Sequence, residues 1–154
     1  MRILAIDLGD KRTGLAIGDT EFKLASPLTV LAIARANHAQ LLDAIDRAVS
    51  EQQPQAIIVG LPLNMDSTTN PRTTLAERFA AELAARTGLE VHLHDERLTS
   101  VAADQRLAAT GLTRKQKKAR QDAIAAAILL QFFLDTHDEQ GNPHQPHPTP
   151  DSAE

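Results

Sequence analysis

The segment from Ile3 to Gly18 restricts the fold more than any other part of this chain. Its first four residues are apolar, which is typical of a strand covered on both faces of a sheet. The run ends on Asp7, a charged turn follows and a second run begins at Thr13, so the segment predicts a β-hairpin. A turn-forming aspartate is the ordinary interpretation of Asp7. Glycines 9 and 14, with cations between them, would also let a phosphate approach the backbone beside a carboxylate.

Hydrophobic periodicity and turn residues define the elements that follow the hairpin. We expect strands over 24–34, 56–60 and 90–94, and helices over 37–53, 70–88, 99–110 and 122–134, with a basic connector over 112–121. Three strands joined by short turns indicate an antiparallel half, and the later alternation of helix and strand indicates right-handed parallel crossovers. The predicted fold class is therefore α/β, a mixed five-stranded sheet with three antiparallel and then parallel strands and helices on both faces.

Composition indicates one folded domain over residues 1–135 and a tail over 136–154. The tail is acidic, rich in proline and histidine and without apolar periodicity, so we predict that it is disordered. The 154-residue chain has a net charge of −4, of which residues 135–154 carry −5, so the body before them is near neutral and remains compatible with nucleic acid. The absence of cysteine, of a signal-peptide pattern and of long apolar runs predicts a cytoplasmic protein without membrane contact.

Carboxylates follow the strands that are expected to run parallel. Asp7 ends the first strand, and Asp95 and Glu96 end the last, where ligands of open α/β sheets gather. Asp122 begins the last predicted helix, where a helix cap is an equally ordinary role. Carboxylates that converge repel one another unless a divalent cation neutralises them, and oxygen ligands alone favour Mg²⁺ or Mn²⁺. Spacing does not choose between Asp95 and Glu96.

The predicted connector is strongly basic, with five lysines and arginines between positions 114 and 120. A solvated loop is the default interpretation of such a run. Beside a carboxylate edge it could instead hold the backbone of a polyanion. The chain has no Trp or Tyr, so base stacking is disfavoured and recognition through shape and phosphate is expected.

Four blocks of the sequence together closely resemble the signature blocks of the YqgF family. In chain order they read AIDLGDKRTGLAIGD, IIVGLPLNMDSTT, HDERLTS and KKARQDAIAAAILLQ. Members of this family are described as pre-16S rRNA nucleases and as Holliday-junction-resolvase-like proteins with a ribonuclease H-like fold. One departure is Ser67, where family members usually have glycine.

The resemblance implies particular site residues. The family's acids fall on Asp7, Glu96 and Asp122, which chooses Glu96 over Asp95 and makes these three the expected catalytic and metal-binding residues. Substrate binding is expected at Gly9, Lys11, Arg12, Asn64, Arg97, Lys117 and Lys118. The implied function is Mg²⁺- or Mn²⁺-dependent maturation of the 5′ end of pre-16S rRNA on the pre-ribosomal small subunit, by a monomer or weak homodimer.

Three other functions compete with this one. A Holliday-junction-type endonuclease acting on branched DNA would use the same acids. A non-catalytic ribosome-assembly factor could keep the shell of the fold, although it would not need three acids. A sugar-kinase or actin-like ATPase needs two related lobes around its nucleotide, and this chain predicts only one.

Overall fold

A computed structural model describes residues 1–97 and 113–143, without the side chains of 115 and 117–119. Within it the chain forms a five-stranded mixed sheet in the order β3-β2-β1-β4-β5. β1 pairs antiparallel with β2, and β2 with β3, whereas β1 pairs parallel with β4, and β4 with β5. The strands are β1 (Arg2–Leu8), β2 (Thr13–Asp19), β3 (Leu24–Leu31), β4 (Ala56–Leu61) and β5 (Glu90–Asp95). The predicted fold class is confirmed.

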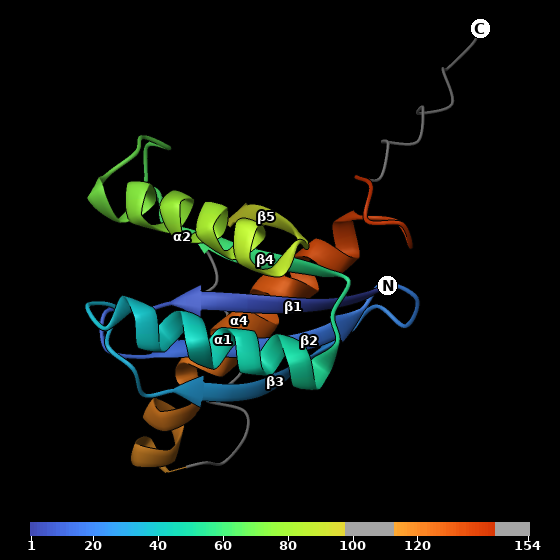
Figure 1. Cartoon of the computed structure of the whole chain (residues 1–154). Helices are drawn as coiled ribbons and strands as arrows, with labels where there is room; N and C mark the ends of the chain where they lie inside the picture. The colour runs from blue at the N-terminus through green and yellow to red at the C-terminus, as the bar shows by residue number, and fades with distance from the viewer. Residues whose placement is uncertain (98–112, 144–154) are drawn as a thin grey trace, which may run out of the picture.

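Helices cover both faces of this sheet (Figure 1). α1 (His38–Gln52) and α2 (Pro71–Thr87) pack on one face, and α4 (Arg114–Thr136) packs on the other. The central strands β1 and β4 are therefore covered twice, which is why their residues are apolar in succession instead of alternating. β3 forms one edge of the sheet, where Pro27 costs no central ladder hydrogen bond.

The helix ends agree with the sequence signals in one case and differ in two. α2 begins as predicted, since Asn70 accepts from the backbone of its first turn and forms a capping box with Thr73. Asn37 precedes α1 but makes no side-chain capping hydrogen bond. The prediction of a basic connector before Asp122 is wrong, because α4 already begins at Arg114, where Thr113 and Gln116 form a second capping box.

Two predicted segments are described only in part or not at all. The predicted helix over 99–110 lies outside the described residues. Of the predicted tail, residues 137–143 form a turn in which His137 bridges to Pro143. The hydroxyl of Thr20 donates to the carbonyl of Glu139 at 2.7 Å, so this turn contacts the end of β2. Residues 144–154 lie outside the described residues. None of the described helices has the length and apolar character needed to cross a membrane.

Candidate active site

Asp7 and Glu96 meet at the carboxyl edge of the three parallel strands. Asp7 lies near the end of β1, Glu96 directly follows β5, and β4 separates the two strands. Gly60 on β4 makes this meeting possible, because a Cβ there would lie 2.5 Å from Oε2 of Glu96. The side chain of Glu96 therefore occupies the space that any other residue at position 60 would fill, and it hydrogen-bonds to Asp7.

The pKa values of both carboxyl groups are raised, which indicates one proton held between them near neutral pH. Burial raises the pKa of Asp7 to about 8, with further contributions from the charge of Glu96, the hydrogen bond to it and the charge of Asp122. Burial also raises the pKa of Glu96, while the hydrogen bond from Asp7 and the charge of Arg72 act to lower that pKa. The proton therefore resides on Asp7, and Glu96 accepts it. A divalent cation bound by Asp7 and Glu96 would displace this proton.

Asp122 reaches the same edge from α4 on the opposite face of the sheet. Gly14 of β2, the register partner of Asp7, faces the backbone of α4, and a Cβ at position 14 would lie 1.9 Å from the carbonyl oxygen of Asp122. This glycine therefore serves the close approach of helix and strand, where the sequence suggested an approach of phosphate. Burial raises the pKa of Asp122, and Arg12 opposes this shift from 3.4 Å between its Nε and the carboxylate Oδ2.

The donor chemistry fits a hard divalent cation. Asp7 and Glu96 are adjacent, Asp122 acts on Asp7 through its charge, and all donors are carboxylate oxygens. Among the described residues, however, no three acidic or histidine side chains stand close enough to hold an ion as they lie. Asp122 is paired with Arg12, so its carboxylate would have to turn from that guanidinium towards the other two acids.

The hairpin turn carries two of the predicted substrate-binding cations. Lys11 is exposed, and Arg12 is paired with Asp122 beside the acids. The backbone N–H of Gly9 donates to the carbonyl of Arg12 at 2.9 Å, so it closes the turn. A Cβ at position 9 would lie 2.4 Å from that carbonyl oxygen, which explains the glycine.

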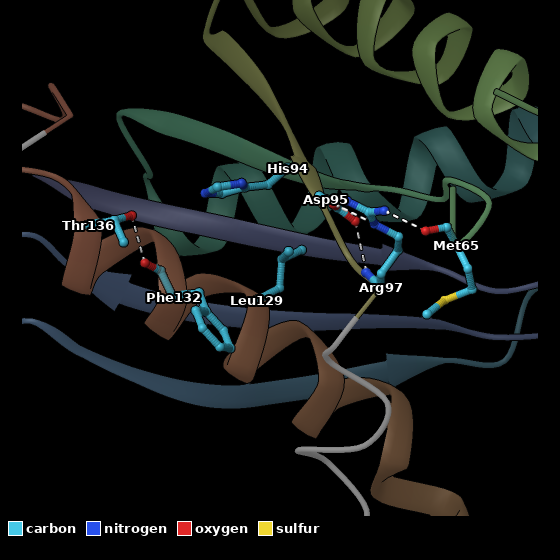
Figure 2. Close-up of a pocket in the computed structure, with 7 residues that line it drawn as sticks. All are labelled: Met65, His94, Asp95, Arg97, Leu129, Phe132 and Thr136. Carbon is cyan, nitrogen blue, oxygen red and sulfur yellow. Dashed lines mark hydrogen bonds and ion pairs between the residues drawn. The ribbon is translucent and has the colours of Figure 1, made fainter. Parts of the chain in front are cut away.

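Asn64 lies in the loop between β4 and α2, and Arg97, which follows β5, hydrogen-bonds to the same loop. The amide of Asn64 donates to the Thr68 hydroxyl at 2.9 Å and accepts from the Asn70 amide at 3.0 Å. Arg97 binds the carboxylate of Asp95 through Nε at 2.7 Å, and its Nη1 donates to the Met65 carbonyl at 3.2 Å (Figure 2). These hydrogen bonds tie the loop to the end of β5, next to Glu96.

Ser67, in the same loop, is the residue that departs from the family pattern. Its φ is +70°, in the left-handed region that favours glycine. Its hydroxyl accepts from Nη1 of Arg97 at 2.9 Å. The serine therefore keeps the glycine-like backbone and adds a hydrogen bond that helps to hold the loop.

Two grooves lie near the end of β5. One, of about 560 Å³, lies beside Glu96 between the loop and the start of α2, with Asn64, Arg72 and Arg97 in its lining. The other, of about 310 Å³, lies between the end of β5 and α4 and is largely apolar, as Leu129 and Phe132 show (Figure 2). The first is the larger and the more polar, and Glu96 forms part of its lining.

Sequence reasoning missed two cations near the acids. Arg72 acts to lower the pKa of both Asp7 and Glu96, and Arg35 acts on Glu96 in the same direction. Arg72 follows the Asn-Pro start of α2, a position that could have been placed at the end of β4 from the predicted topology. Arg35 lies in the irregular segment after β3, where the sequence gives no comparable signal. The side chains of Lys117 and Lys118 lie outside the described part of the structure.

Comparisons with known proteins agree on one family. A family model described as "RuvX: Holliday junction resolvase" matches residues 1–136. A protein of Chloroflexus aurantiacus named "Putative pre-16S rRNA nuclease" is 39% identical over 152 residues, which cover 99% of this chain and 97% of that protein. A protein of Dechloromonas aromatica with the same name is 41% identical over 151 residues and covers 98% of each.

Solved structures share the fold at low sequence identity. Thermus thermophilus RuvC has a TM-score of 0.54 and 17% identity, with 87% of this chain and 94% of RuvC covered. Fowlpox virus resolvase in complex with Holliday junction DNA has a TM-score of 0.57 and 12% identity, with 88% and 97% covered. The sheet is thus the ribonuclease H-like sheet of the resolvases.

Proposed function

The chain belongs to the RuvX family, as its resemblance to YqgF proteins indicated, and we propose that it is a metal-dependent nuclease for the 5′ end of pre-16S rRNA. The observation that carries this proposal is the meeting of Asp7 and Glu96 at the carboxyl edge of the parallel strands, hydrogen-bonded to each other and with raised pKa values, with Asp122 close by. Strongly shifted carboxylates that converge at a sheet edge mark a functional site, because a fold gains no stability from them. The names of the full-length relatives supply the substrate.

The residues of this chain divide the work among them. Asp7, Glu96 and Asp122 would hold Mg²⁺ or Mn²⁺, which when bound supplies an activated water and neutralises charge at the phosphate. To bind the metal, Asp7 would release its proton, and the carboxylate of Asp122 would turn away from Arg12. The guanidinium of Arg12 is then available to a phosphate oxygen at the same edge, with Lys11 in the same turn.

The same site could act on branched DNA, and one observation favours this second function. The structures that share the fold are Holliday junction resolvases, and one of them is bound to a junction. The three acids would serve either nucleic acid, since a phosphodiester is common to both.

One experiment separates these functions. Purified protein is incubated with a pre-16S rRNA fragment that includes the 5′ leader, a four-way DNA junction and single-stranded RNA, each with Mn²⁺ or with chelator. We expect metal-dependent cleavage of the precursor, and loss of cleavage in Asp7→Asn and Asp122→Asn. Asp43→Asn, an exposed carboxylate on α1, is the matched control and should keep full activity. Cleavage of the junction alone would assign the DNA function, and no cleavage by well-folded protein would leave a non-catalytic assembly factor.

Lys117 and Lys118 are proposed to hold the substrate backbone, since they belong to the basic first half of α4, before Asp122. Changing both to Ala should raise KM and make the salt dependence of binding shallower, by a slope of about 0.7–0.9 for each phosphate that the protein no longer neutralises. Turnover at saturating substrate should persist, because uniform binding affects KM alone. An unchanged salt slope would mean that these lysines are only solvated.

A further inference from the structure

Two arginines from distant parts of the chain are joined by one carboxylate near the acids. Nη2 of Arg35 lies 3.1 Å from Oδ1 of Asp10, and Nη2 of Arg72 lies 3.7 Å from the same oxygen. Asp10 belongs to the hairpin turn after β1, Arg35 to the segment after β3 and Arg72 to the first turn of α2. The three side chains together carry a net charge of +1.

Arg72 occupies a position where it does not help the helix. It follows Pro71 in the first turn of α2, which contains no acidic residue, and the positive end of the helix dipole repels a cation there. The backbone N–H of Arg72 is satisfied by Oδ1 of Asn70, so the helix start does not depend on this side chain. The side chain of Arg72 is about half exposed, at 53%. A cation in this place has a reason other than helix stability.

Arg35 shows a second departure from what stability favours. Its side chain is only 18% exposed, and its Nε is buried without a hydrogen-bond partner among the described residues. Buried donors are nearly always paired in folded proteins, so an unpaired guanidinium N–H is a departure that calls for an explanation. Nη2 of Arg35 is held by Asp10, and the side chain lines a groove on the surface.

Each of the two arginines also lines a groove. Arg72 lines the groove of about 560 Å³ that contains Glu96. Arg35 lines a separate groove of about 580 Å³, with Asp10 and Arg78 among its other lining residues. A strand that leaves the acids along the start of α2 would pass one guanidinium and then the other.

We propose that Arg35 and Arg72, oriented by Asp10, bind a backbone phosphate of the nucleic-acid strand on the α2 side of the acids. This inference rests on the proposed nuclease function and extends it, because it gives the strand a path on the flank opposite α4. Two guanidinium forks that converge suit a phosphodiester, which accepts through two oxygens. The carboxylate of Asp10 holds the forks in place and leaves an excess of positive charge.

The test measures binding separately from cleavage. Affinity for a labelled pre-16S rRNA fragment is titrated against salt in chelator for Arg72→Gln, Arg35→Gln and the double variant. Each single variant should make the slope of log affinity against log salt shallower by up to about 0.7–0.9. Arg86→Gln is the matched control, an arginine in the last turn of α2 that Asp43 and Asp46 hold away from the acids, and its slope should equal the wild type's.

A second arm locates the phosphate and guards against misfolding. RNAs with a single neutral methylphosphonate linkage are scanned along the strand, and the loss of affinity at one position should vanish in Arg72→Gln. Thermal melts establish that each variant is folded, and Arg72→Gln remains decisive if Arg35→Gln is unstable. Unchanged slopes with an unchanged methylphosphonate profile would overturn the inference while leaving cleavage intact. If RNA binds as expected but is never cleaved, the nuclease proposal fails and the phosphate site stands.

Discussion

Replacing Asp7 by Asn should stabilise the metal-free protein at neutral pH while it abolishes cleavage. The cause is the pKa of Asp7, which burial and the charge of Glu96 raise to about 8 from an ordinary value of 3.8. Asn has nearly the same shape and needs no proton to stay neutral. Its amide can donate to Glu96 as the protonated carboxyl of Asp7 does, so the fold keeps this hydrogen bond.

The direction and the size of this difference in stability follow from proton linkage. Between pH 3.8 and about 8 the folded protein keeps a proton on Asp7 that the unfolded chain has released. Stability is therefore fully present below the unfolded pKa and falls as pH rises towards the folded pKa, by about 1.4 kcal/mol per pH unit. At pH 7 the upper limit is about 4 kcal/mol. Because Asp7 and Glu96 share one proton, this amount is counted once for the pair.

Urea unfolding in chelator from pH 5.5 to 8.5 measures the effect. The free energy of unfolding of Asp7→Asn minus that of the wild type should grow with pH and level off above about pH 8, and histidine titrations common to both proteins cancel in this difference. Asp66→Asn is the control. Hydrogen bonds from Thr68 lower the pKa of Asp66, so its contribution is lost only as pH falls through the acid range, and its difference should be flat here.

Divalent metal should make the wild type more stable than Asp7→Asn, the reverse of their order in chelator. Mg²⁺ or Mn²⁺ that binds the folded state alone stabilises the wild type by mass action, and it should have little effect on Asp7→Asn. A difference between the two proteins that stays constant from pH 5.5 to 8.5 would refute the shared proton. A metal response of equal size in both would refute the role of Asp7 as a ligand.

Three further predictions concern the residues that shape the site. Gly60→Ala should leave the urea midpoint almost unchanged but reduce kcat at least tenfold, because the added Cβ displaces only the flexible carboxylate of Glu96. Gly14→Ala should destabilise by about 1–3 kcal/mol or more in urea, since its Cβ would meet the backbone of α4 at Asp122. Arg97→Gln should speed proteolysis of the loop between β4 and α2, which its guanidinium ties to Asp95; equal cleavage in wild type and variant would contradict this.

The sheet and its acids could be predicted because they depend on local patterns. The run Ile3 to Ile6 and the segment AIIVG are apolar without alternation, which only a doubly covered strand requires, and both proved central. Once those strands are parallel, Asp7 and the residues after β5 must share an edge. The choice of Glu96 over Asp95 depended on family resemblance, and its surroundings agree, since Asp95 is paired with Arg97.

Other features of the structure could not be predicted from the sequence, for physical reasons. The start of α4 was missed because Lys and Arg carry no apolar stripe, although the capping pair Thr113 and Gln116 was visible in the sequence. The close approach at Gly14 and the pairing of Arg35 with Asp10 are tertiary interactions between distant segments. No local propensity encodes them.

Departures from stability at one edge of the sheet are themselves an argument for function. The raised pKa of Asp7 keeps it protonated at neutral pH, and Arg72 stands at the positive end of a helix dipole. Elsewhere the same helix obeys the ordinary rule, with Arg86 in its last turn and carboxylates of α1 around it. One helix thus carries a favourable arginine at its far end and an unfavourable one beside the acids. Selection for stability alone would not produce that asymmetry, whereas binding of a phosphate and a cation at this edge would relieve each departure that faces it.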